Sequence, residues 1–191
     1  MRFQHAIELD LPPEPVFAFF NGLETWFRLN PQWQVLSFHG NPALREGSVF
    51  ALDVEYDRAE LKVSYRGLIT EVAPGRSLSL HLMGEPPREM TIEVIPTSTV
   101  TLLKYREEVE QPLSGKEQME LTLWLKSAAN YILVSQRNSP VSRAWKWFLD
   151  RYWLKMSPSG RRTVFFVVAA EGLSLLFFLL ILVWLLLFKR I

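Results

Sequence analysis

The sequence predicts an α+β domain that ends in a membrane anchor: about seven antiparallel strands, a long helix, an amphipathic helix and one transmembrane helix. Three observations support this prediction. Residues 2–109 contain successive runs of alternating polar and apolar side chains joined mostly by short turns. After Gly115 the apolar period changes to that of a helix. Residues 163–188 exceed the roughly 20 apolar residues that span a bilayer and carry one charge, Glu171.

The chain opens with a predicted strand and two short helices. Residues 2–9 alternate in polarity, with His5 on the apolar face. The prolines of the segment LPPEP then suit the first turn of a helix, because proline is tolerated there. Residues 24–29 predict a second short helix, which Asn30 and Pro31 end.

Six further strands are predicted at residues 33–39, 48–56, 61–72, 78–83, 90–95 and 100–109. Gly67 interrupts the longest of these runs, so we expect a bulge or bend there. The short gap at 96–99 predicts a hairpin. Short turns between successive strands favour an antiparallel sheet.

Two helices of different character are predicted after the strands. The first covers residues 116–136 and carries one apolar stripe, formed by Leu121, Leu125, Ala128, Ala129, Ile132 and Leu133. Ser139 then caps a second helix at 141–156, with Pro140 at its first position. Residues 157–160 predict a hinge before the transmembrane helix.

This order of elements resembles the helix-grip fold of the START/SRPBCC superfamily, which includes the birch-pollen-allergen proteins and polyketide cyclases. The resemblance covers about residues 2–137. It rests on the segments IELDLPPEPVFAFFNGLETWFRLNP, GSVFALDVEY, YRGLITEVAPGRSLSLHL and YREEVE. It implies a curved sheet that grips the long helix around a cavity for lipids, sterols, quinones or other apolar molecules.

The layout with a C-terminal membrane segment is similar to the subunit-G-like proteins of carbon monoxide dehydrogenase systems. We therefore expect a START-like domain at 1–137, a juxtamembrane helix and hinge at 138–160, and the anchor at 161–191.

Five side chains are candidates for the lining of such a cavity: His5, Tyr56, Tyr65, Tyr105 and Glu107. Ligand pockets are mostly apolar with a few placed polar groups, and tyrosine hydroxyls can bind a quinone or sterol oxygen. Glu107 shares a strand face with Leu103 and Tyr105, where it can orient a ligand hydroxyl or serve proton chemistry. The alternatives are a paired or cavity-mouth glutamate, ordinary strand tyrosines and a core histidine.

The sequence offers no pattern for catalysis or metal binding. It lacks the nucleophile-elbow, P-loop and dinucleotide-binding motifs, and its histidines are not at metal-ligand spacing. Cysteine is absent, which excludes disulfides and thiolate sites. We therefore expect no cofactor, no metal and no enzyme activity, because a cyclase-like reaction has no supporting group of residues.

Charge is segregated along the chain. Residues 1–136 hold 12 basic and 18 acidic residues, whereas residues 137–162 hold seven basic residues against Asp150 alone. A basic cluster before a transmembrane helix is retained in the cytoplasm and attracts anionic lipid. We therefore expect a cytoplasmic N-terminal domain, although Lys189 and Arg190 weakly oppose this orientation. Nucleic acid is not an expected partner, because the basic residues lie beside the anchor.

The helix at 141–156 is basic, aromatic and amphipathic, which is typical of a helix that lies in the membrane interface. The alternatives are packing on its own domain or on a partner protein. The expected membrane-interface residues are Arg143, Trp145, Lys146, Phe148, Arg151, Tyr152, Trp153, Lys155, Arg161 and Arg162.

Glu171 is the polar exception in the anchor. Intramembrane carboxylates are costly and usually paired, and the neighbouring Gly172 and Ser174 allow close helix approach. We therefore expect a helix–helix contact at Glu171. The alternative is that the span begins at Gly172 and Glu171 lies among the headgroups.

Two functions follow from the sequence. The first is a membrane-tethered binding protein for an apolar small molecule such as a lipid or quinone. The second is an accessory subunit of a larger membrane complex, whose grip is filled by its own aromatic side chains.

Overall fold

The computed structural model describes residues 2–40, 44–57, 61–108 and 113–188, with side chains described up to Trp184. The chain divides into two compact units, Met1–Lys155 and Met156–Ile191. The second unit contains one helix, α5 (Pro158–Phe188). The first contains, in chain order, β1 (Arg2–Leu9), α1 (Pro13–Ala18), η1 (Phe19–Gly22), α2 (Leu23–Arg28), β2 (Trp33–His39), β3 (Val49–Tyr56), β4 (Leu61–Ala73), β5 (Ser77–Met83), β6 (Arg88–Pro96), β7 (Thr101–Glu108), α3 (Gly115–Gln136), α4 (Pro140–Arg151) and η2 (Trp153–Lys155).

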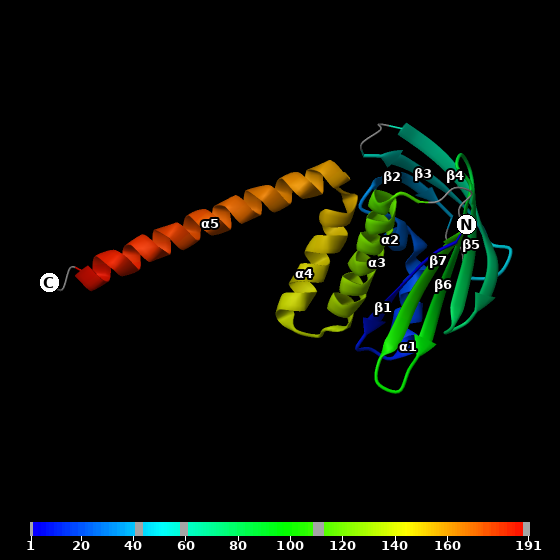
Figure 1. Cartoon of the computed structure of the whole chain (residues 1–191), viewed down its shortest axis with the longest axis horizontal. Helices are drawn as coiled ribbons and strands as arrows, with labels where there is room; N and C mark the ends of the chain where they lie inside the picture. The colour runs from blue at the N-terminus through cyan, green and yellow to red at the C-terminus, as the bar shows by residue number, and fades with distance from the viewer. Residues whose placement is uncertain (1, 41–43, 58–60, 109–112, 189–191) are drawn as a thin grey trace. The chain divides into compact units, whose positions relative to one another are not determined.

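The predicted α+β fold is confirmed. The strands form one 7-stranded sheet in the order β1-β7-β6-β5-β4-β3-β2. Every neighbouring pair is antiparallel, and successive strands from β2 to β7 are neighbours. Figure 1 shows this sheet curving around α3, with α1 and α2 beside the same helix. The arrangement is a helix grip.

The core lies between the inner face of the sheet and α3. Its largest buried side chains include Trp26 from α2, Trp33 from β2 and Trp124 from α3. The apolar stripe predicted for α3 is buried except for Leu133, which is partly buried. Trp124 and Tyr131 are buried as well, because the sheet and α1 enclose a wider band of α3 than the aliphatic residues mark.

A capping box fixes the start of α3. The Ser114 hydroxyl accepts a hydrogen bond from the Glu117 amide, and the Glu117 side chain accepts one from the Ser114 amide. The hydroxyl of Ser114 lowers the pKa of the Glu117 carboxyl. Both orphan donors at this helix end are thereby satisfied.

The bulge expected at Gly67 lies elsewhere. The register of β4 against β5 shifts between Ile69 and Glu71, and β2 shifts against β3 between Val35 and Ser37. Gly67 instead pairs with Phe50 of β3, whose ring occupies the space where a Cβ would stand. The glycine serves close packing rather than a change of register.

Of the segment 157–160 that was expected to form a hinge, residues 158–160 begin α5, and the boundary between the two compact units lies just before it, between Lys155 and Met156. α5 begins at Pro158, a residue that suits the first position of a helix. The Ser157 hydroxyl caps it by accepting a hydrogen bond of 3.1 Å from the Gly160 amide. The preceding helix is also shorter than predicted, because α4 ends at Arg151 and the turn η2 follows. Within α5, Pro158–Trp184 is long and apolar enough to cross a membrane.

Replacement of Gly67 by alanine should destabilise the first unit by about 1–3 kcal/mol, because the added methyl group displaces the Phe50 ring from a packed interior. Gly115→Ala is the matched control, since a Cβ there meets no atom within 4 Å. Denaturant unfolding of the full chain in mild detergent measures both. Equal stability of the two variants would contradict the packing role of Gly67.

Candidate functional site

The inner face of the sheet carries a buried ion pair. Glu107 of β7 is 1% exposed. Its Oε1 accepts a hydrogen bond of 3.0 Å from Arg88 Nη1, at the start of β6. Its Oε2 accepts a hydrogen bond of 2.9 Å from the Tyr105 hydroxyl. Each carboxylate oxygen therefore has a donor, as a buried charge requires.

Arg88 extends this network toward β3 and β4. Its guanidinium lies over the Trp33 ring, 5.3 Å from the ring centroid. Its Nη2 is 3.5 Å from the Tyr56 hydroxyl, which is in turn 3.0 Å from the Tyr65 hydroxyl. The guanidinium thus connects the carboxylate on β7 with a pair of tyrosine hydroxyls on β3 and β4.

The structure brings Tyr56, Tyr65, Tyr105 and Glu107 together, as four of the candidate cavity residues. His5 lies outside this network, half-buried on β1 and directly opposite Tyr105 in the register. Whether any of the five binds a ligand stays a prediction. Glu107 is paired with a cation, one of the alternatives that the sequence left open.

Arg88 is the functional candidate that sequence reasoning missed. A signal was present: Arg88 stands two residues before Met90 and therefore shares a strand face with Met90, Ile92 and Val94, whose side chains are buried. An arginine in phase with such a strand face points inward unless the strand ends first. The partner that makes this position favourable, Glu107, is distant in sequence and is set by the β6–β7 register.

Burial and neighbouring charges set the ionisation of the network. Burial raises the pKa of Tyr105 well above its ordinary value, and the Glu107 carboxylate raises it further. Burial also raises the pKa of Tyr65, together with its hydrogen bond to Tyr56. For Arg88, burial opposes the charge, but the Glu107 carboxylate and the tyrosines raise its pKa above the ordinary value. The site therefore holds a cation beside a carboxylate and neutral tyrosines.

Hydrogen-bond donors exceed acceptors in this interior. Arg88 Nε and Trp26 Nε1 are buried and have no acceptor among the described residues. Trp124 Nε1, by contrast, donates a hydrogen bond of 2.8 Å to the Trp26 carbonyl. Orphaned buried donors are rare in folded proteins and require an explanation. Of these two donors, Arg88 Nε belongs to the polar network, where an acceptor oxygen would be stabilised.

Aromatic rings occupy the middle of the grip. The rings of Trp26 and Trp124 stack with centroids 4.4 Å apart. The Trp33 ring lies 5.6 Å from Trp124 and 5.9 Å from Tyr65, and Tyr105 lies 5.7 Å from Trp124. The walls around the polar network are therefore aromatic, and these rings fill the space beneath α3.

The polar network lies at the end of β7 and is in contact with solvent. Glu107 is the next-to-last residue of β7, the strand that precedes α3 in the chain. The Arg88 side chain is 21% exposed, and Tyr56 is half-buried.

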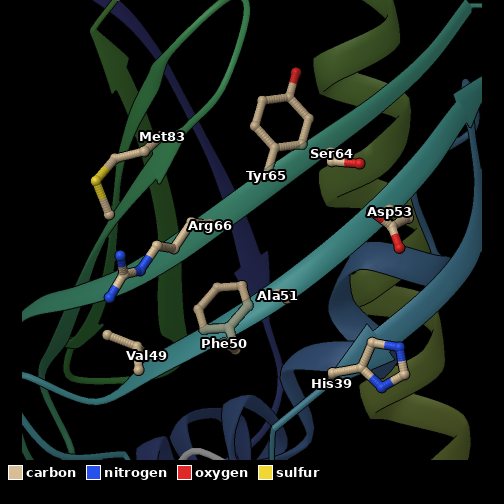
Figure 2. Close-up of a pocket in the computed structure, with 9 residues that line it drawn as sticks. All are labelled: His39, Val49, Phe50, Ala51, Asp53, Ser64, Tyr65, Arg66 and Met83. Atoms are coloured by element: carbon tan, nitrogen blue, oxygen red, sulfur yellow. The ribbon is translucent and has the colours of Figure 1, made fainter.

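A separate open hollow of about 560 Å³ lies over β3 and β4 (Figure 2). Val49, Ala51 and Asp53 line it and alternate with the buried Phe50, Leu52 and Val54, which places most of the hollow on the outer face of the sheet. Asp53 accepts a hydrogen bond from the Ser37 hydroxyl, which lowers its pKa. The residues that line the hollow are His39, Val49, Phe50, Ala51, Asp53, Ser64, Tyr65, Arg66 and Met83.

The hollow includes one predicted site residue, Tyr65, and collects no group for metal binding. Throughout the part of the chain that the structure describes, no three His, Asp or Glu side chains lie together as metal ligands.

The expected membrane-interface residues divide by burial. Arg143, Trp145, Arg151, Tyr152 and Lys155 are exposed on the first unit, whereas Lys146, Phe148 and Trp153 are half-buried there. Arg161 and Arg162 lie in the first turn of α5, and Glu171 is exposed further along it. Their contact with a membrane stays a prediction.

Comparison with solved structures identifies the architecture. A protein from Chromobacterium violaceum superposes with a TM-score of 0.57 at 18% identity, over 69% of this chain and 96% of that chain. The AHSA1-like protein from Aeromonas hydrophila superposes with a TM-score of 0.56 at 15% identity, over 71% of this chain and 94% of that chain. Ara h 8.0201 superposes with a TM-score of 0.50 at 14% identity, over 70% of this chain and 97% of that chain. The chain has the helix-grip fold of these structures. No family model matches the chain, and no curated protein does.

Loss of either partner of the buried ion pair should destabilise the first unit by about 3 kcal/mol, because the other charge is left unpaired in the interior. We expect Arg88→Met and Glu107→Leu each to have this effect, and the double variant to cost much less than their sum. Denaturant unfolding in detergent measures the cycle. The exposed pair Arg2–Glu108 is the control, and its removal should change stability far less. Additive costs at Arg88 and Glu107 would contradict the pairing.

The tyrosines should titrate in two stages. Because Tyr65 and Tyr105 have a raised pKa when folded, they stabilise the fold below their unfolded value near 10, and this stabilisation is lost as pH rises above it. The absorbance of tyrosinate should therefore include a late fraction, which the double variant Tyr65→Phe, Tyr105→Phe reduces to the contribution of Tyr131, whose pKa is also raised by burial. A single transition at the unfolded value would show that these hydroxyls are not buried.

Proposed function

We propose that this chain is a membrane-tethered binding protein for an apolar small molecule that carries an acceptor oxygen, such as a lipid or quinone. The observation that carries the proposal is the buried Nε of Arg88, which has no acceptor among the described residues although Arg88 is paired with Glu107 and lies over the Trp33 ring. An apolar ligand body suits those walls, and a carbonyl or ether oxygen suits the donors.

The charge of the site favours a neutral head group. Glu107 already neutralises Arg88, so a ligand carboxylate would add an unpaired negative charge. The spare hydrogens of the guanidinium and the Tyr56–Tyr65 hydroxyl pair can donate to a neutral oxygen without this cost. Both carboxylate oxygens of Glu107 already accept hydrogen bonds, from Arg88 and from Tyr105, so we propose binding rather than catalysis.

The position of the network suits a ligand taken from a bilayer. α4 packs antiparallel to α3, so α4 ends toward the side of the first unit where α3 begins (Figure 1). Glu107 of the polar network stands at the end of β7, the strand from which the chain passes to the beginning of α3. The chain then continues within a few residues into the apolar α5, which we take to be a transmembrane anchor with the first unit in the cytoplasm.

A second function is favoured by the packing of the grip. Trp26, Trp33 and Trp124 fill space that a cavity would occupy. A domain filled in this way suits an accessory subunit of a membrane complex. In that case Glu171 of α5 contacts another membrane helix, and Glu171→Leu should release the partner subunits.

Native mass spectrometry of the full chain, purified in mild detergent with its bound molecules extracted in parallel, tests the proposal. We expect one stoichiometric apolar molecule with an oxygen-containing head group. Tyr56→Phe should lower its retention several-fold, because a donor at the open end of the network is removed. Tyr152→Phe, a substitution on α4 outside the network, should leave retention unchanged. An empty protein that copurifies with other membrane subunits would contradict the proposal and support the second function.

A further inference from the structure

The helix α4 is fixed to the first unit along one side. The Tyr131 hydroxyl on α3 donates 2.6 Å to Asp150, and Lys146 donates 2.9 Å to the other oxygen of the same carboxylate. The Lys146 ammonium also lies 5.5 Å from the centre of the Tyr131 ring. We call these three contacts among Tyr131, Lys146 and Asp150 the clamp. Burial and the hydrogen bond to Asp150 raise the pKa of Tyr131, so its hydroxyl keeps its proton and the clamp is intact at neutral pH. This side of α4 therefore packs on the first unit.

The remaining surface of α4 and its C-cap residue expose large apolar side chains. Val141 is 78% exposed, Trp145 50%, Trp147 60% and Tyr152 46%. The aromatic rings contact one another, with Trp147 and Tyr152 at 5.5 Å between centroids. Exposed single apolar residues are ordinary, but a contiguous group that includes two tryptophans indicates an interaction surface. Sequence reasoning missed Trp147, because it lies off the stripe of Trp145, Phe148 and Tyr152.

Cations surround this apolar group. Arg143, Arg151 and Lys155 are exposed, and none forms an ion pair with another described residue. Asp150, the acidic residue of this helix, is already bound by Lys146 and Tyr131. The free surface therefore combines aromatic side chains with uncompensated positive charge.

We propose that this exposed surface of α4 and η2, formed by Val141, Arg143, Trp145, Trp147, Arg151, Tyr152 and Lys155, lies in the headgroup layer of an anionic bilayer. Tryptophan and tyrosine favour that layer, and lysine and arginine near it are attracted by anionic lipid. The apolar helix α5 begins only three positions after Lys155. A second copy of the chain suits this face less well, because like charges would meet.

The clamp gives this surface a consequence beyond tethering. α4 is bonded to α3, and α3 supplies Trp124 to the wall of the grip. Contact of α4 with the bilayer would therefore hold the grip at a fixed orientation to the membrane surface, whereas a flexible tether alone would leave that orientation free. The docking surface is independent of whether the grip binds a ligand.

Spin labels on the full chain test the proposal directly. The chain has no cysteine, so a single introduced cysteine labels one site. The label is placed at Val141→Cys or Trp147→Cys, and at Val49→Cys on the outer face of the sheet as the control. The protein is reconstituted in nanodiscs of phosphatidylcholine alone or mixed with phosphatidylglycerol. Collision with lipid-soluble oxygen is compared with collision with a water-soluble nickel chelate.

In nanodiscs that contain phosphatidylglycerol, we expect the labels at 141 and 147 to collide with the nickel chelate several-fold less often than the label at 49. The label at 49 should remain fully accessible to the chelate. The triple variant Arg143→Glu, Arg151→Glu, Lys155→Glu should restore the collision of the label at 141 with the nickel chelate without releasing the protein from the nanodisc. Labels at 141 and 147 as accessible as the label at 49 would overturn the proposal. Shielding from both reagents with dipolar broadening would also overturn it, in favour of contact between two copies.

Discussion

The interior of the first unit depends on the Arg88–Glu107 ion pair. Desolvating two charges costs several kcal/mol for each ion, and mutual attraction offsets this cost only when further hydrogen bonds satisfy both groups. Glu107 meets this condition through Arg88 and Tyr105. Arg88 meets it only in part, because its Nε has no acceptor among the described residues. The curvature of the sheet is what brings the tyrosines of β3 and β4 within reach of a charge on β6 (Figure 1).

Packing and binding compete in this grip. Each tryptophan beneath α3 contributes a large buried apolar area, which stabilises the fold and occupies ligand space. The polar network lies at the edge of this packed region, where Arg88 retains contact with solvent. A fold stabilised by ring stacking in its middle can thus keep a small binding site at one end. This arrangement favours recognition of a head group over complete enclosure of a ligand.

The positions of the strands and their antiparallel pairing were readable from the sequence, because alternation over runs such as Val49–Tyr56 reports which face is buried and short turns join successive strands. Features that depend on a partner across the sheet were not. Gly67 appeared to mark a bulge, whereas it makes room for Phe50 on the neighbouring strand. Glu107 was recognised as unusual, but its partner Arg88 follows only from the register of β6 and β7. The start of α5 was missed because Pro158 and Ser157 suit a helix start as well as a hinge.

The central claim is that Arg88 offers a free donor to an oxygen of an apolar ligand. The most direct measurement is a proton–nitrogen NMR spectrum of the arginine side chains in the full chain, in nanodiscs of a single synthetic phospholipid and in nanodiscs of lipid extracted from its own membrane. The Arg88 Nε–H resonance is assigned by its loss in Arg88→Lys. The account predicts that this resonance moves in the native extract while that of Arg2, an exposed arginine, stays in place. An unchanged Arg88 resonance in both nanodiscs would contradict it.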